Sequence, residues 1–106
     1  MSGMLPVPNS IKVGPLTYPV RWKRWKKKTG KCGETHLVKQ TIAVREGLSL
    51  DRMSDTLLHE ALHCMLAQMG YENDNEEWVV TALAPLLLQL LRDNPETLEY
   101  ILHKEG

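Results

Sequence analysis

The stretch His59-Glu60-Ala61-Leu62-His63 decides the fold, because it lies in the middle of the longest segment with helical periodicity. Apolar residues recur at helical spacing from residue 49 to residue 70 and cover nearly the whole circumference of the predicted helix. A helix that is apolar nearly all round normally runs through the core of a protein. The two histidines would therefore be partly buried polar groups, and such groups need a partner.

The spacing of this motif indicates a zinc site. His59 and His63 are one helical turn apart, so both imidazole rings can reach one ion from the same side. A catalytic zinc takes imidazole and carboxylate ligands and keeps one position for water. Glu60 lies further round the helix, beside such an ion, where it can exchange a proton with that water. We therefore expect Zn2+ on the two histidines and Glu60 as general base, and a third protein ligand is still required.

Glu76 and Glu77 are the candidates for the third ligand, at the start of a second predicted helix over residues 74–92. A helical wheel places Glu76 in the middle of the apolar face of that helix, which is unfavourable for an unpaired carboxylate. Glu77 lies toward the edge of that face, with Thr81 one turn later to orient it. Glu77 could equally complete a capping pair with Asp74 as N-cap. The spacing alone leaves the choice open.

Strand-like segments precede the central helix, and helices follow it. Strands are predicted over residues 11–13, 16–22, 34–38 and 40–44. Pro19 predicts an edge position for the second strand, because proline cannot donate a hydrogen bond to a neighbour. The fourth strand is expected to be available for pairing with an extended peptide. Pro85 is expected to kink the second helix, and a short third helix should begin at Asn94-Pro95.

Length and composition predict a single domain over residues 1–106, with residues 1–9 as a loose N-terminal arm. The hydrophobic fraction of 42% and the charged fraction of 25% are those of an ordinary globular protein. No apolar run is long enough to span a membrane, and no leader pattern is seen, so we expect a cytoplasmic protein without a membrane partner. The two cysteines, Cys32 and Cys64, are too few for a disulfide framework.

The formal net charge of zero conceals two oppositely charged halves. Residues 1–50 carry ten Lys/Arg against two acids, and residues 51–106 carry three against eleven. The densest basic run, residues 21–31, also contains Trp22 and Trp25. One interpretation is nucleic-acid binding, with indoles stacking on bases and cations on phosphates. The other is a solvated hairpin end whose tryptophans cap the core. The cations considered for nucleic-acid contact are Lys23, Arg24, Lys26, Lys27 and Lys28.

The motif and its surroundings resemble a known family. The stretch HEALH, the segment GPLTY at residues 14–18 and the segment LRDNPE at residues 91–96 together resemble the small zinc metallopeptidases encoded by bacteriophages and prophages. These belong to the zincin-like, glutamate-ligand branch of metallopeptidases, and the resemblance covers nearly the whole chain. It implies an α+β fold with a small, twisted, antiparallel-rich sheet packed on the HExxH helix, followed by two C-terminal helices.

The resemblance also implies roles for individual residues. His59 and His63 match the metal ligands, and Glu60 matches the general base. The family's downstream pattern, an acid followed by apolar residues at +3 and +6 and alanine at +7, fits Glu77 better than Glu76. No tyrosine or histidine matches the oxyanion-stabilising group of larger zincins.

The expected function is therefore zinc-dependent hydrolysis of a peptide or protein substrate, in the host cytoplasm if the chain is phage-encoded. The alternative is a zinc-stabilised, non-catalytic module that contacts nucleic acid or a regulatory protein through residues 21–31.

Overall fold

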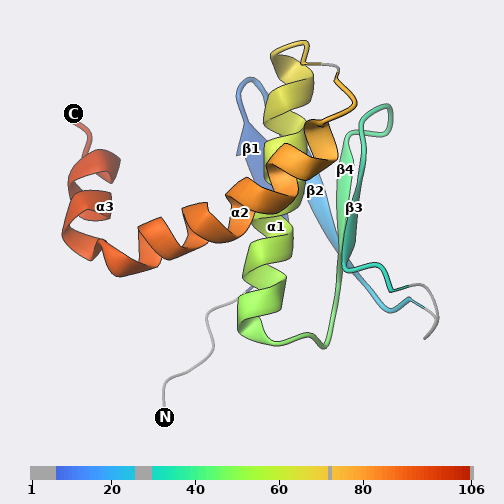
Figure 1. The fold of residues 1–106 in the computed structure, drawn as a ribbon, viewed down its shortest axis with the longest axis horizontal. Coiled ribbons are helices and arrows are strands. Elements are labelled where there is room, and N and C mark those ends of the chain that lie inside the picture. The colour runs from blue at the N-terminus through green and yellow to red at the C-terminus, as the bar shows by residue number, and fades with distance from the viewer. Residues whose placement is uncertain (1–6, 26–29, 72, 106) are drawn as a thin grey trace.

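The part of the chain that the computed structural model describes, residues 7–25, 30–71 and 73–105, contains strands followed by helices (Figure 1). The predicted α+β class is confirmed, and the bounds of the elements shift by a few residues. The strands are β1 (Ser10–Val13), β2 (Leu16–Lys23), β3 (Gly33–His36) and β4 (Thr41–Arg45), and the helices are α1 (Leu50–Gln68), α2 (Glu76–Asp93) and α3 (Pro95–Leu102).

The strands form a mixed sheet in the order β1-β2-β4-β3. The β1/β2 and β3/β4 pairs are antiparallel, and β2 and β4 are parallel. The prediction that Pro19 marks an edge strand is wrong, because β2 lies inside the sheet. Pro19 is accommodated there because it pairs with Ser10 of β1, and pairing with β4 begins only at the next residue, Val20.

The prediction that the fourth strand is available to an extended peptide is also wrong. β4 is paired on both sides, with β2 and with β3, so its backbone groups are occupied. The edge strands of the described sheet are β1 and β3, and β3 lies against α1. Strand order depends on contacts between distant segments, which the alternation within one strand does not encode.

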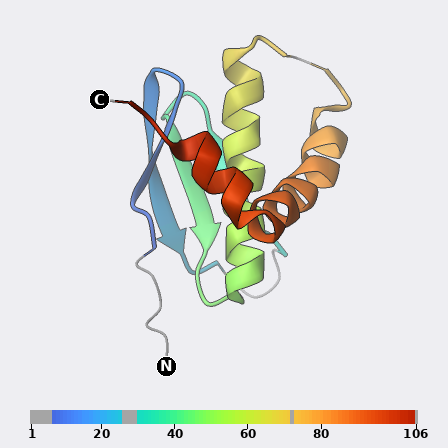
Figure 2. The same cartoon turned by 90° about the vertical axis from the view of Figure 1, so that its left-hand side faces the viewer.

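Helix α1 lies against one face of the sheet (Figure 2). In β2, alternate residues face this helix side of the core: Tyr18 and Val20 are buried, and Trp22 is half-buried. From α1, Cys64 is fully buried in the same cluster, and burial raises the pKa of its thiol to about 11. The full set of buried residues in this core is Val13, Tyr18, Val20, Ile42, Val44 and Cys64.

The ends of α1 follow from local sequence. Ser49 is the N-cap, and its side chain accepts a hydrogen bond from the backbone N–H of Arg52 at 3.2 Å. The helix ends just before Gly70, which adopts a left-handed conformation with φ of 75°. These two signals fix the helix so that the HExxH segment occupies its middle.

Helix α2 crosses α1 and carries Val80 and Ala84 into a second apolar cluster with Leu62. Helix α3 follows after a sharp turn at Asn94 and contacts α2 alone among the described elements. Of the predicted N-terminal arm, residues 7–9 are described and lie outside the strands, and residues 1–6 lie outside the described part. Within the described residues, no helix combines the length and apolarity needed to cross a membrane.

Candidate metal centre

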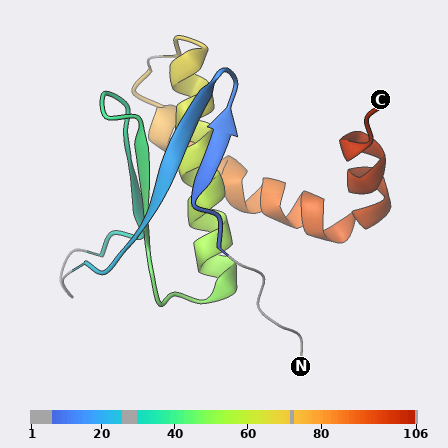
Figure 3. The ribbon, with the colours of Figure 1, turned by 180° about the vertical axis from the view of Figure 1, so that it is seen from behind.

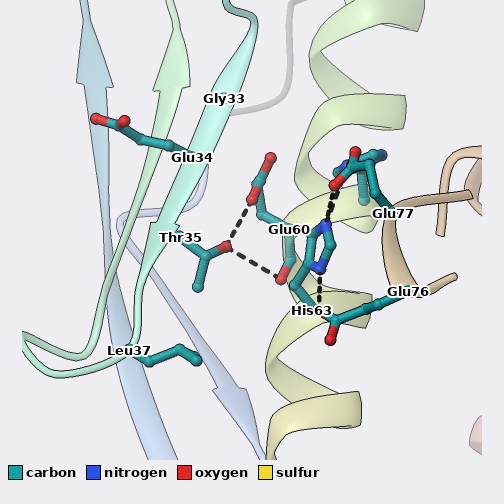
Figure 4. Close-up of a pocket in the computed structure, with 9 residues that line it drawn as sticks. Gly33, Glu34, Thr35, Leu37, Glu60, His63, Glu76 and Glu77 are labelled. Atoms are coloured by element: carbon teal, nitrogen blue, oxygen red, sulfur yellow. Dashed lines mark hydrogen bonds and ion pairs between the residues drawn. The ribbon is translucent and has the colours of Figure 1, made fainter. Parts of the chain in front are cut away.

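Three potential ligand atoms converge at the crossing of α1 and α2 (Figure 4). The Nε2 atoms of His59 and His63 are 3.3 Å apart. The carboxylate of Glu77 reaches both, with Oε1 2.9 Å from Nε2 of His59 and Oε2 3.0 Å from Nε2 of His63. The histidines are largely buried, whereas the Glu77 side chain is 69% exposed. The site thus combines a buried nitrogen pair with one accessible oxygen ligand.

This donor set fits a divalent metal ion. In a tetrahedral zinc site with metal–ligand distances near 2.0 Å, neighbouring ligand atoms are about 3.3 Å apart. The separation of the two Nε2 atoms agrees with that spacing, and the Glu77 oxygens lie slightly closer. Three protein ligands leave one tetrahedral position for a water or a substrate atom. His59, His63 and Glu77 therefore lie close enough together to hold a metal ion.

Glu76 is also part of the centre, but it binds the other side of His63. Its Oε2 lies 2.6 Å from Nδ1 of His63, and a carboxylate at that distance requires the proton on Nδ1. The lone pair of Nε2 is then directed at the metal position. The helical wheel correctly placed Glu76 toward the core, and the partner that its carboxylate needs is His63.

Glu77 is held in place by its own helix. The Thr81 hydroxyl donates to Oε1 of Glu77 at 3.3 Å, as the sequence predicts. The alternative capping role is not formed, because Asn75 rather than Asp74 is the N-cap of α2 and no side chain caps the helix. Glu77 is therefore free to serve the metal centre from the first turn of α2.

Glu60 lies beside the three ligands and is itself only 5% exposed. Its Oε1 accepts a hydrogen bond of 2.6 Å from the hydroxyl of Thr35, on β3, as Figure 4 shows. Burial raises the pKa of Glu60, and the Thr35 hydrogen bond opposes that change. Thr35 is a site residue that the sequence analysis missed, since it stands 25 positions away and carries no motif.

The raised pKa of Glu60 predicts a pH-dependent cost to folding in the metal-free protein. A raised folded-state pKa contributes stability below the unfolded pKa, and that contribution is lost as the pH rises through the folded pKa. Glu60→Gln, which can still accept from Thr35, should therefore stabilise the metal-free protein at pH 7 by on the order of 1 kcal/mol. Urea unfolding with a chelator present measures the difference, which should vanish near pH 4.

A matched control lies on the same strand as Thr35. The pKa of Glu34 is lowered, chiefly by the Lys31 side chain and further by His36. Glu34→Gln should accordingly destabilise the protein at pH 7. If both variants shift the free energy of unfolding in the same direction, burial of Glu60 is not the cause of the change seen in Glu60→Gln.

Gly33 allows β3 to approach α1 closely. A Cβ at this position would lie 2.5 Å from Cγ2 of Thr56 and 3.0 Å from both the Ala43 carbonyl oxygen and Oε2 of Glu60. Gly33→Ala is therefore expected to destabilise the protein by about 1–3 kcal/mol. Urea unfolding measures this, with Lys39→Ala in the exposed turn after β3 as a control that should change little. An unchanged midpoint for Gly33→Ala would contradict the close approach.

Two cavities meet at the centre, and both are lined by Gly33, His59, Glu60 and Glu77. One, of about 340 Å³, extends toward Leu37 and Glu76. The other, of about 600 Å³, extends toward Cys32, Arg52 and Thr81. The same four residues thus border both cavities.

The basic run is less available than the nucleic-acid interpretation requires. Trp22 is half-buried, and its indole N–H donates to the carbonyl of Pro8 at 2.9 Å. Trp25 has the guanidinium of Arg45 over its ring at 5.5 Å. Lys23 is exposed, and Arg24 is paired with Glu46 at 3.2 Å. Lys26, Lys27 and Lys28 lie outside the described residues. Trp22 packs against the core, as the second interpretation expects, but the run is not a hairpin end, because it joins β2 to β3 and these strands are not paired. Nucleic-acid binding stays a prediction.

Comparisons with protein families, with curated proteins and with solved structures found no match for this chain. The case for a function is therefore made from the geometry of the centre and from its chemistry.

Proposed function

We propose that this protein is a zinc-dependent peptidase with a minimal zincin-like fold. The observation that carries the proposal is the convergence of His59, His63 and Glu77 beside a buried glutamate, Glu60, that is not among the converging ligands. Ligands alone would suit a structural site. A buried acid placed next to them, where two cavities border the same residues, is what hydrolysis requires.

Zinc, when bound, would polarise a peptide carbonyl and lower the pKa of water from about 15.7 to about 7. Glu60 accepts the proton that the attacking water gives up and returns it to the leaving amine. Thr35 occupies Oε1 of Glu60, so Oε2 is the oxygen left for proton exchange.

The substrate lies extended along β3 in this proposal. β3 is at the edge of the sheet, and Gly33 and Thr35 on this strand line the cavity at the centre. An edge strand offers unpaired backbone groups to a peptide, which gives affinity without requiring a particular side chain. β3 thus takes the role that the sequence analysis assigned to the fourth strand. A peptide paired with it would bring its backbone carbonyls past Glu60.

The proposed class is supported by the arrangement of the elements. The sheet packs on α1, α1 carries both histidines, and α2 brings the third ligand, which is the arrangement that the resemblance to phage and prophage metallopeptidases implies. A phage or prophage origin and a place in the host cytoplasm belong to the same proposal.

Metal analysis of the purified protein, combined with a proteolysis assay, tests this function. We expect one zinc per chain and hydrolysis of unfolded casein that stops on chelation and returns when zinc is added. Magnesium added at the same concentration is the control, because a site of two imidazoles and one carboxylate favours zinc. Stoichiometric zinc with no cleavage of casein or of a mixed peptide library would contradict the catalytic proposal and leave a metal-binding protein.

A further inference from the structure

Helix α2 has a second apolar row beside the one that packs on α1. Val80 and Ala84 are fully buried against α1. The neighbouring row is largely open, with Leu83 44%, Leu86 63% and Leu90 57% exposed. Within the described chain, α1 therefore covers only part of the apolar face of α2.

The open row has the spacing of a helix-pairing seam. It consists of the half-buried Val79 and the exposed Leu83, Leu86 and Leu90, which are separated by four, three and four residues, as in the a and d positions of heptads. The spacing of four, three and four residues is the same in both directions along the helix. If two copies of α2 lie antiparallel, Val79 of one faces Leu90 of the other, and Leu83 faces Leu86. A surface that is complementary to itself in this way suits a two-fold dimer.

The apolar surface continues onto the flanking helices. Met65 and Met69 of α1 are exposed and lie three and seven residues after Leu62, on the side of α1 that meets α2. α2 extends away from the sheet, and α3 sits at its far end, as Figures 1 and 3 show. Three consecutive apolar residues of α3 are also exposed: Tyr100, Ile101 and Leu102.

The size of this surface matches a stable dimer. The eight exposed side chains named above are each at least 44% exposed, and together they offer on the order of 800 Å². They are Met65, Met69, Leu83, Leu86, Leu90, Tyr100, Ile101 and Leu102. A standard interface buries about 800 Å² on each partner.

We infer that the protein forms a two-fold dimer in which the α2 helices of two copies pair antiparallel through Val79, Leu83, Leu86 and Leu90. Arg92, on another side of α2, is already held by Asp51 at 2.6 Å and stays outside this seam. The first turn of α2 carries Glu77, so pairing would hold the helix of the third ligand from a second side. The inference does not depend on the presence of a metal or on catalysis.

Sedimentation velocity of the full-length, zinc-loaded protein tests the dimer. We expect a species of twice the chain mass of 12.1 kDa. Leu86→Glu should weaken association at least about a hundredfold, because it buries a carboxylate in an apolar seam. Val38→Glu is the matched control, since Val38 is fully exposed in the turn after β3 and should leave the dimer intact. A monomeric wild type, or a monomeric Val38→Glu variant, would overturn the inference.

Disulfide cross-linking tests the orientation and does not require Leu86→Glu to fold. In a Cys32→Ser background, a mixture of Val79→Cys and Leu90→Cys chains should oxidise to a covalent heterodimer, and Val79→Cys alone should not cross-link. Residues 79 of two antiparallel copies would be about 16 Å apart, which is too far for a disulfide. Cross-linking of Val79→Cys alone, or the absence of the heterodimer, would overturn the antiparallel pairing.

Discussion

Glu60→Gln is expected to lower kcat for peptide hydrolysis by about 10²- to 10⁴-fold while zinc stays bound. The amide has the shape of the carboxylate and can keep the 2.6 Å hydrogen bond from Thr35, so the site should retain its structure. It cannot accept a proton from water, however, and the proton transfer loses its base. Cleavage of casein by zinc-loaded wild type and variant at equal concentration, with zinc content measured in parallel, gives the comparison.

Glu34→Gln is the control for this experiment. Glu34 also lies on β3, but its side chain points away from Glu60 (Figure 4). It pairs with Lys31 and His36 instead. The Glu34→Gln variant should hydrolyse casein at close to the wild-type rate. Wild-type activity in Glu60→Gln would remove Glu60 from the mechanism, and the proposed reaction would need another base.

Zinc affinity should separate the two neighbouring glutamates. Glu77→Gln is expected to weaken zinc binding on the order of 10²- to 10³-fold, because the variant loses the share of the binding free energy that one ligand supplies. Glu76→Gln should weaken it by about tenfold or less, because an amide oxygen can still accept the hydrogen bond from Nδ1 of His63. Competition with a chromogenic zinc chelator measures both affinities.

His63→Ala is the reference variant for these zinc affinities. It removes one ligand and leaves the Glu76 carboxylate without its partner, so its loss of affinity should be at least that of Glu77→Gln. If Glu76→Gln loses zinc and Glu77→Gln keeps it, the assignment of the third ligand is reversed. Thr81→Val, which removes only the hydroxyl that orients Glu77, should fall between the wild type and Glu77→Gln.

Local sequence predicts much of this fold because the buried faces of helices and strands recur in the sequence at short, fixed spacings. The 49–70 segment predicts α1 to within two residues, and the strand predicted over residues 16–22 matches β2 to within one residue. The proximity of His59 and His63 follows from the same reasoning, since residues four apart on a helix are neighbours wherever the helix lies.

Local periodicity does not predict which helices and strands lie next to one another. Pro19 seemed to require an edge strand, yet β2 is interior, because its pairing with β4 begins after the proline. The choice between Glu76 and Glu77 also depends on how α2 crosses α1. At the observed crossing, one carboxylate reaches Nδ1 of His63 and the other reaches Nε2, so the wheel and the downstream pattern each identified a real partner of the same histidine.

The sequence by itself therefore determined the central helix, the two imidazoles on one of its faces and the acid between them, because those relations span at most four residues. Only the tertiary structure decided that β3 is an edge strand, that Gly33 lets it approach α1, and that Thr35 holds Glu60. These contacts join segments more than twenty residues apart. Their geometry is fixed by the order of strands and the crossing of helices, which no local periodicity encodes.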